Sequence, residues 1–371
     1  MRNGIAVALA LLPVVVSSAR AEPAQSTVLS VSQQFYAPAS DADDKPRGIS
    51  GIACAPPQAD GPRECIVAND EEAALERVRL GADTFSPMGK TVPIAAGQGD
   101  IAAIVGSARA AGCPVKSDEP VFGKPDTEGL SFAGGYLYAA GSHSCSGGGK
   151  YRPSSFLLTR YRVEAGGTFA PADAPPERSW RLADALVASD AGAAYGKRKD
   201  DGTNVEGIAV ADGLVYAGLR TPLLDNRAVI VTAPVDQLFA PGTSPLDAAS
   251  VNTFRIPLGL GSGIRDLAAL SGERLLILSG PTHIQTDVPY RLWLADRTRL
   301  DEPPLFLAAV APTPDGSGTI PKGRGYGGDQ PKAEAVAVLE QTADTVTVLV
   351  MYDNVDEGWP TRLTIRLPNE K

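Results

Sequence analysis

A five-residue motif that recurs five times constrains the fold of this chain more than any other feature. The copies read ISGIA at 49–53, TEGLS at 127–131, VEGIA at 205–209, IRDLA at 264–268 and AEAVA at 333–337. Each copy is followed by a turn and a second apolar strand, so the repeating unit begins with a β-hairpin. Self-similarity of this kind indicates an architecture built from repeated units of supersecondary structure.

Further strands follow the hairpins. Third strands are predicted near 155–161, 228–233, 290–295 and 362–367, and a fourth near 251–257. Four antiparallel strands per unit is the blade of a β-propeller. The last unit lacks a fourth strand, and we expect Thr27 to Phe35 to supply it and to close the ring. The sequence therefore predicts an all-β chain with a single β-propeller of five blades, or of six if residues 95–120 contain a degenerate copy.

The N-terminus has the pattern of a signal peptide. An apolar run from Ile5 to Val16 follows Arg2 and precedes small residues that end at Ala21, which predicts a signal peptide over 1–21 and a propeller domain over 22–371. The run is too short to span a bilayer, and no later stretch is apolar enough. We therefore expect a periplasmic or secreted protein without a membrane span.

The charge balance restricts the possible partners. Without Arg2 and Arg20, 32 of the 34 Lys and Arg remain against 43 Asp and Glu, a formal charge of about −11. An acidic chain of this kind is not expected to bind nucleic acid. We expect a monomer whose partner is a small anionic ligand or substrate.

The four cysteines are expected to form two disulfides. An even number of cysteines in an exported chain favours bridges, and the absence of a CxxC pair argues against a zinc site. Cys54 ends the first strand of its hairpin and Cys65 begins the second, whereas Cys113 and Cys145 belong to loops of the opposite face. The predicted bridges therefore join 54 to 65 and 113 to 145.

Polar residues gather at one end of the predicted channel. Because neighbouring strands of a blade are antiparallel, the start of the first strand and the end of the second lie together. The starts carry Ser50, Glu128, Glu206, Arg265 with Asp266, and Glu334. The ends carry Asp70 with Glu71, His143, Arg220, His283, and Asp353 with Asn354. The sequence thus predicts a ring of charged side chains at one mouth of the channel.

This ring suggests two kinds of chemistry. Three Glu near one axis repel one another unless Arg or a cation offsets their charge, and Ca²⁺ binds carboxylate and carbonyl oxygens. The predicted metal ligands are Glu206, Glu334 and Asp353, with Ca²⁺ as the expected cation and no organic cofactor. The predicted catalytic residues, which would hold an anion and move a proton, are Glu128, His143, Glu206, Arg220, Arg265 and Asp266. The alternative is that these groups only pair with one another and orient the blades.

Several other catalytic classes are disfavoured. Two histidines exclude a three-His zinc site and the HExxH helix, and no Gly-x-Ser-x-Gly elbow is present. The glycines before Lys150 lack the strand-to-helix context of a phosphate-binding loop.

Three motif pairs carry a family resemblance. They are Asp126–Leu130 with Gly141–Ser144, Asn204–Ala209 with Gly218–Leu223, and Gly263–Leu267 with Leu278–Pro281. In order and spacing they resemble the family of exported propeller-like proteins known as domain of unknown function 3616. Ala335, where the family has Gly, and the insertion with Cys113 depart from its pattern. The resemblance implies a propeller, and its nearest look-alikes are described as esterase-like or phytase-like propellers in which carboxylates and calcium handle phosphate esters.

Two functions remain open on this basis. The first is a metal-assisted hydrolase of phosphate or carboxylate esters that acts at the channel mouth. The second is a non-catalytic propeller that binds a ligand or another exported protein there. A lactonase-like or sugar-processing propeller is a third reading, and the two Arg at the mouth argue against it.

Overall fold

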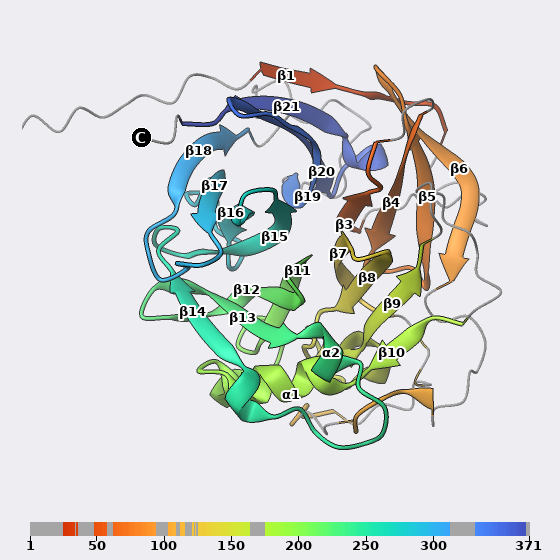
Figure 1. Ribbon diagram of the computed structural model, residues 1–371. Coiled ribbons are helices and arrows are strands. Elements are labelled where there is room, and N and C mark those ends of the chain that lie inside the picture. The colour runs from red at the N-terminus through yellow and green to blue at the C-terminus, as the bar shows by residue number, and fades with distance from the viewer. Residues whose placement is uncertain are drawn as a thin grey trace, which may run out of the picture.

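Five β-sheets stand around a central axis in the computed structural model (Figure 1). The structure describes residues 25–33, 35, 48–57, 62–93, 103–108, 112–115, 121, 123, 125–163, 175–311 and 331–368. The predicted signal peptide over 1–21 lies outside these residues. The predicted all-β propeller with five four-stranded antiparallel blades is confirmed.

The strands follow one another from the channel outwards within each blade. Blade 1 contains β3 (Ile49–Cys54), β4 (Arg63–Asn69), β5 (Ala74–Leu80) and β6 (Thr84–Pro93). Blade 2 contains β7 (Thr127–Ala133), β8 (Tyr136–Gly141), β9 (Leu158–Arg162) and β10 (Glu177–Ser179). Blade 3 contains β11 (Asn204–Ala211), β12 (Leu214–Leu224), β13 (Arg227–Pro234) and β14 (Asn252–Ile256). Blade 4 contains β15 (Ser262–Leu270), β16 (Arg274–Pro281), β17 (Tyr290–Asp296) and β18 (Leu305–Val310). Blade 5 contains β19 (Lys332–Gln341), β20 (Thr345–Asp353), β21 (Thr361–Arg366) and the N-terminal strand β1 (Gln25–Val28).

The N-terminal segment closes the ring, as predicted. Strand β1 pairs antiparallel with β21 from Gln25 to Val28, and β2 (Ser30–Val31) then pairs parallel with β6 of blade 1. The closing strand is thus shorter than the predicted 27–35 and starts two residues earlier, because the segment divides between two blades. One segment therefore ties the last blade to the first and covers the outer edge of blade 5.

The region where a sixth blade was considered does not supply one in its described part. Residues 103–108 and 112–115 form isolated bridges, from Val105 to Ser179 and from Val115 to Lys150, instead of an inner strand.

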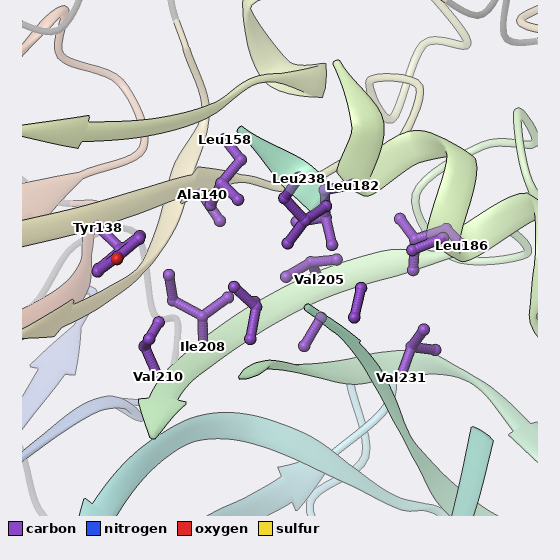
Figure 2. Close-up of a cluster of buried hydrophobic side chains, with 14 of the residues drawn as sticks. Tyr138, Ala140, Leu158, Leu182, Leu186, Val205, Ile208, Val210, Val231 and Leu238 are labelled. Atoms are coloured by element: carbon purple, nitrogen blue, oxygen red, sulfur yellow. The ribbon is translucent and has the colours of Figure 1, made fainter. Parts of the chain in front are cut away.

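The hydrophobic core is divided among the blade interfaces. Each of five buried clusters joins one pair of neighbouring blades around the ring. Between blades 2 and 3, Leu158 and Val205 pack with Leu182 and Leu186 of helix α1 (Arg181–Ala188), as Figure 2 shows. The short helix α2 (Val235–Leu238) adds Leu238 to the same cluster. Because every blade buries apolar side chains against two neighbours, a blade depends on the closed ring for its stability.

Both predicted disulfides are present. Cys54 is bonded to Cys65 across the first hairpin of blade 1, and Cys113 is bonded to Cys145 in a loop of blade 2. None of the helices among the described residues has the length and apolar character that a bilayer crossing requires.

Candidate functional site

The same irregularity in all five inner strands builds the site. In every blade the pairing between the inner strand and its neighbour shifts register across the second residue of the repeated motif, which is a β-bulge. A bulge inserts an unpaired residue and redirects its side chain. The five bulge residues are Ser50, Glu128, Glu206, Arg265 and Glu334, all at most 8% exposed. The repeat therefore places one buried polar side chain per blade at the same end of the channel, which we call the charged end.

Close packing of the inner strands explains the glycine that follows the bulge in blades 1 to 3. A Cβ on Gly129 would lie 2.6 Å from the backbone nitrogen of Ile208, and one on Gly207 would lie 2.4 Å from Cα of Asp266. Such contacts are too short for any side chain. The glycine thus lets the inner strand of the next blade approach.

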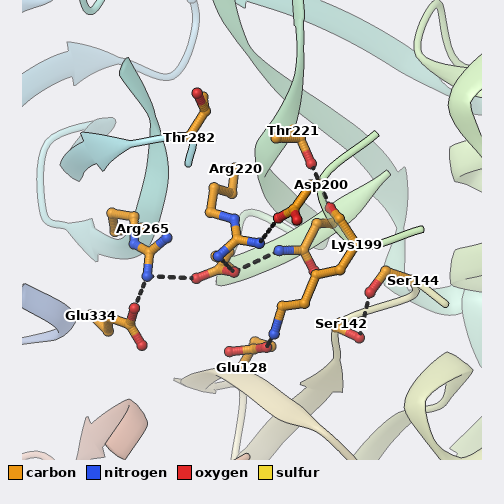
Figure 3. Close-up of polar contacts among 12 residues, drawn as sticks. Glu128, Ser142, Ser144, Lys199, Asp200, Arg220, Thr221, Arg265, Thr282 and Glu334 are labelled. Atoms are coloured by element: carbon orange, nitrogen blue, oxygen red, sulfur yellow. Dashed lines mark hydrogen bonds and ion pairs between the residues drawn. The ribbon is translucent and has the colours of Figure 1, made fainter. Parts of the chain in front are cut away.

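Glu206 is the central anion of the charged end, and its partners Arg220 and Arg265 are labelled in Figure 3. Its carboxylate oxygens lie 3.3 Å from Nη1 of Arg220 and 3.3 Å from Nη2 of Arg265, and Oε1 accepts a hydrogen bond of 2.6 Å from Asn204. Burial alone would raise the pKa of Glu206, but Arg220, Arg265 and Lys199 together lower it to about 2. Glu206 is therefore ionised across the physiological pH range.

Arg265 links two of the bulge carboxylates. It contacts Glu334 as well as Glu206, and its side chain is only 3% exposed. Arg220 is more accessible at 14%, and its second ion pair is with Asp200, at 3.6 Å, whose side chain is 65% exposed. Of the two arginines predicted to hold an anion, Arg220 is therefore the one whose partner, the exposed carboxylate of Asp200, can be replaced by an anion that enters from solvent.

Lys199 organises a second group of carboxylates in the ring. Its Nζ is 2.8 Å from Oε1 of Glu128 and 3.9 Å from Oδ1 of Asp126. Burial raises the pKa of Glu128 well above its usual value. The positive charge of Lys199 opposes this shift, and the negative charge of Glu206 adds to it. Burial would lower the pKa of Lys199, but Asp126, Glu128 and Glu206 raise it. A carboxyl group with a raised pKa thus lies in the same ring as the ionised Glu206.

Asp70, directly after β4, completes this second group. One carboxylate oxygen from each of Asp70, Asp126 and Glu128 lies within 4.8 Å of the other two. Oδ1 of Asp70 is buried and has no hydrogen-bond partner among the described residues. Burial, followed by repulsion from Asp126, raises the pKa of Asp70 to about 7. We call Asp70, Asp126 and Glu128 the carboxylate trio.

The trio differs from the predicted metal ligands. Glu206 and Glu334 converge on Arg265 instead of on an open position, and Asp353 pairs with Lys332 at 3.2 Å. Burial raises the pKa of Asp353, although Lys332 opposes the shift. The trio instead brings three carboxylate oxygens together, and Oδ1 of Asp70 has no hydrogen-bond partner among the described residues. Such a donor set suits a hard cation such as Ca²⁺.

Asp266 is completely buried and joins blade 4 to blade 5. Its Oδ2 accepts a hydrogen bond of 2.7 Å from the backbone nitrogen of Val336, and its Oδ1 accepts one of 2.8 Å from Leu267. Burial raises the pKa of Asp266 well above its usual value, and the two backbone donors oppose this. Asp266 thus occupies the motif position that is Gly in blades 1 to 3 and uses its carboxyl group to bridge two inner strands.

His143 is enclosed beside the ring. It is 0% exposed, its Nδ1 lies 2.8 Å from the carbonyl oxygen of Gly141, and its ring meets Phe156 edge-on. Burial lowers the pKa of His143 to about 4, although the Gly141 carbonyl opposes the shift. The imidazole is therefore neutral at pH 7, with Nδ1 as the donor and a buried Nε2 that has no partner.

Lys199, Asp200 and Asp126 belong to the site but were not predicted to be part of the ring. Lys199 belongs to a loop whose backbone is held by Thr221, which donates hydrogen bonds to the carbonyls of Lys199 (3.1 Å) and Gly202 (2.8 Å). The run of charges KRKDD at 197–201 was the available signal. Asp126 immediately precedes the TEGLS copy and accepts a hydrogen bond from Ser142.

The fold and the site define a five-bladed β-propeller with a buried ionic cluster at one end of its channel. Residues 194–363 match the family described as "Protein of unknown function (DUF3616)", which confirms the resemblance predicted from the motifs over this range. No curated protein matches the chain.

Similar solved structures share little sequence with the chain. A hypothetical protein from Leishmania major has a TM-score of 0.41 and 9% identity, with 94% of this chain and 91% of that one covered. The Bacteroides ovatus protein described as xyloglucan PUL GH43B has a TM-score of 0.40 and 10% identity, with 87% of this chain and 52% of that one covered. The α-L-arabinofuranosidase PaAbf62A from Podospora anserina has a TM-score of 0.38 and 12% identity, with 92% of this chain and 97% of that one covered. None of these similarities assigns an activity to the chain.

Proposed function

We propose that the chain is a hydrolase of phosphate or carboxylate esters that acts at the charged end of its channel. The observation that supports this is the separation of pKa values among buried carboxyl groups in one ring. Glu128 and Asp70 have raised pKa values, whereas that of Glu206 is lowered to about 2. Environments that divide carboxyl groups into proton holders and permanent anions are typical of general acid-base catalysis.

The roles of the residues follow from these states. Glu128 gives a proton to the leaving group or takes one from water, and Asp70, with a pKa of about 7, exchanges protons near neutral pH. Glu206 remains ionised and holds Arg220 and Arg265 in place. Arg220 binds the anionic part of a substrate when that group displaces the exposed carboxylate of Asp200.

A divalent cation fits the carboxylate trio when Asp70 and Glu128 are ionised, and Glu128 then acts as a ligand instead of a proton donor. The three oxygens supply hard ligands, and the buried, unpartnered Oδ1 of Asp70 is the atom that such a cation would satisfy. Ca²⁺ held there would polarise a substrate oxygen or lower the pKa of a bound water. Because the cation competes with the proton on Asp70, we expect Ca²⁺ affinity to rise as the pH increases through about 7.

The direct test is turnover of phosphate and carboxylate esters by the mature chain, with Ca²⁺ and with a chelator. Glu128→Gln replaces a protonated carboxyl group by a neutral amide of the same shape, so the variant should fold and lose turnover by at least about 100-fold. Asp225→Asn, at a 76% exposed carboxylate in a hairpin of blade 3, is the matched control and should retain full activity. Absence of turnover on every ester, with either addition, would refute the hydrolase.

The dense ion pairing favours a second function, ligand binding without turnover. Glu206 and Glu334 are both paired with arginines, and Lys199 is paired with Glu128, so the ring is already neutralised in part by its own side chains. A binding propeller predicts saturable binding of a small anion that weakens in an Arg220→Gln variant, with no product formed.

We also propose that the protein is exported to the periplasm or secreted as a monomer. The N-terminal pattern over 1–21 and the two disulfides support export. N-terminal sequencing of the exported protein should begin at Glu22, and retention of residues 1–21 would contradict this.

A further inference from the structure

The opposite end of the channel contains a cavity of about 600 Å³. It lies where the inner strands β3, β7, β15 and β19 end, whereas the charged end lies where the same strands begin. Its volume is within the range of cavities that hold small ligands. Because the walls belong to strands of four blades, the cavity is part of the rigid ring.

The walls of this cavity are mainly apolar. Phe132, Ala269, Val338 and Leu339 line it and are only partly buried, although each packs against one of the clusters between blades. Apolar side chains that remain accessible inside a concave surface gain free energy when a ligand covers them. The cavity therefore suits a molecule with a hydrocarbon body.

Arg63 supplies a fixed positive charge in the wall. Its guanidinium donates hydrogen bonds to the backbone carbonyls of Ala55, Leu339 and Val338, so its position is set by two blades. None of the described residues forms an ion pair with Arg63, and burial lowers its pKa, which reflects the cost of an uncompensated charge. Three of the five N–H donors bind these carbonyls, and none of the described residues accepts a hydrogen bond from the other two. Glu340 also lines the cavity but is exposed to solvent.

We propose that this cavity binds a small amphiphilic carboxylate, such as a medium-chain fatty acid, with its carboxylate on Arg63 and its hydrocarbon body against Phe132, Val338 and Leu339. The charge of Arg63 selects an anionic head group, and the walls select an apolar body. The site is separate from the charged end and does not depend on the proposed hydrolase.

The test is calorimetric titration of the mature chain with decanoate, decanol and decyltrimethylammonium, three ligands with the same chain and different head groups. Decanoate should bind at one site, at least about ten-fold more tightly than decanol, and the cation should not bind. Arg63→Met should bring the affinity for decanoate down to that for decanol.

A second variant separates cavity binding from loss of structure. Leu339→Trp fills the cavity and should abolish decanoate binding while the circular dichroism spectrum stays that of a folded chain, whereas Leu305→Trp, at an exposed position of β18, should leave binding unchanged. Equal binding of the three ligands, or decanoate binding that survives in a folded Leu339→Trp variant, would overturn the proposal.

Discussion

The two ends of the channel are built from the same inner strands and differ completely in chemistry. Strand β7 contributes Glu128 to the charged end and Phe132 to the cavity, and β19 contributes Glu334 and Leu339 in the same way. The bulge near the start of each inner strand is the source of the difference, because it turns one polar side chain per blade into the ring. A β-bulge repeated in every blade can thus place polar groups at one end of the channel while the rest of each inner strand remains apolar.

The largest expected effect is at Glu206. Glu206→Leu removes the shared partner of Arg220 and Arg265 and leaves buried positive charge, which should lower the free energy of unfolding by about 3–5 kcal/mol in urea denaturation at pH 7. The folded-state pKa of Glu206 is about 2, so its contribution is complete above about pH 4.5 and is lost as the pH falls towards 2. The difference between wild type and variant should therefore shrink over that range. A constant difference would show that the ion pairs are not its source.

A smaller effect on stability is expected at Gly207, which follows the bulge residue of β11. Gly207→Ala places a Cβ 2.4 Å from Cα of Asp266 and should lower the free energy of unfolding by about 1–3 kcal/mol. Gly147→Ala is the control, because a Cβ there meets nothing within 4 Å, and its effect should stay within about 0.5 kcal/mol. Equal unfolding midpoints for the two variants would contradict the close packing of the inner strands.

An effect of the opposite sign is expected at Asp70. Its raised pKa means that the folded state keeps a proton that the unfolded state releases, so ionised Asp70 reduces stability as the pH rises from about 4 to about 7. Asp70→Asn should therefore gain up to about 4 kcal/mol relative to wild type over this range, at about 1.4 kcal/mol per pH unit. The measurement is urea denaturation at pH 4, 5.5 and 7.5, with Gly147→Ala, which changes no titratable group, as a variant whose difference from wild type should not change with pH. A pH-independent effect of Asp70→Asn would mean that Asp70 titrates normally.

Much of this architecture could be predicted because it depends on the order of strands. Antiparallel pairing fixes which strand ends meet, so the convergence of Glu128, Glu206, Arg220 and Arg265 followed from the motif alone. The closing N-terminal strand and both disulfides were likewise predicted from the order of strands within each hairpin and blade.

The remaining features depend on contacts between blades, which a linear pattern does not contain. Lys199 reaches Glu128 from a loop of another blade, and Asp70 meets Asp126 from a neighbouring blade. The bridge from Asp266 to Val336 likewise arises only when two inner strands approach closely. For this reason the sequence predicted metal ligands at Glu206, Glu334 and Asp353 and did not group Asp70, Asp126 and Glu128 with one another.

The most direct test of the account is an infrared titration of the carboxyl groups in the mature chain. The account predicts that carboxyl protons persist at pH 6, and that part of this signal disappears in Asp70→Asn and another part in Glu128→Gln, because both groups have raised pKa values. The signal should be unaffected in Gly147→Ala, which changes no carboxyl group. Complete ionisation of all carboxyl groups by pH 5, or a residual signal that neither variant reduces, would contradict the claim that the charged end holds protons beside a permanently ionised Glu206.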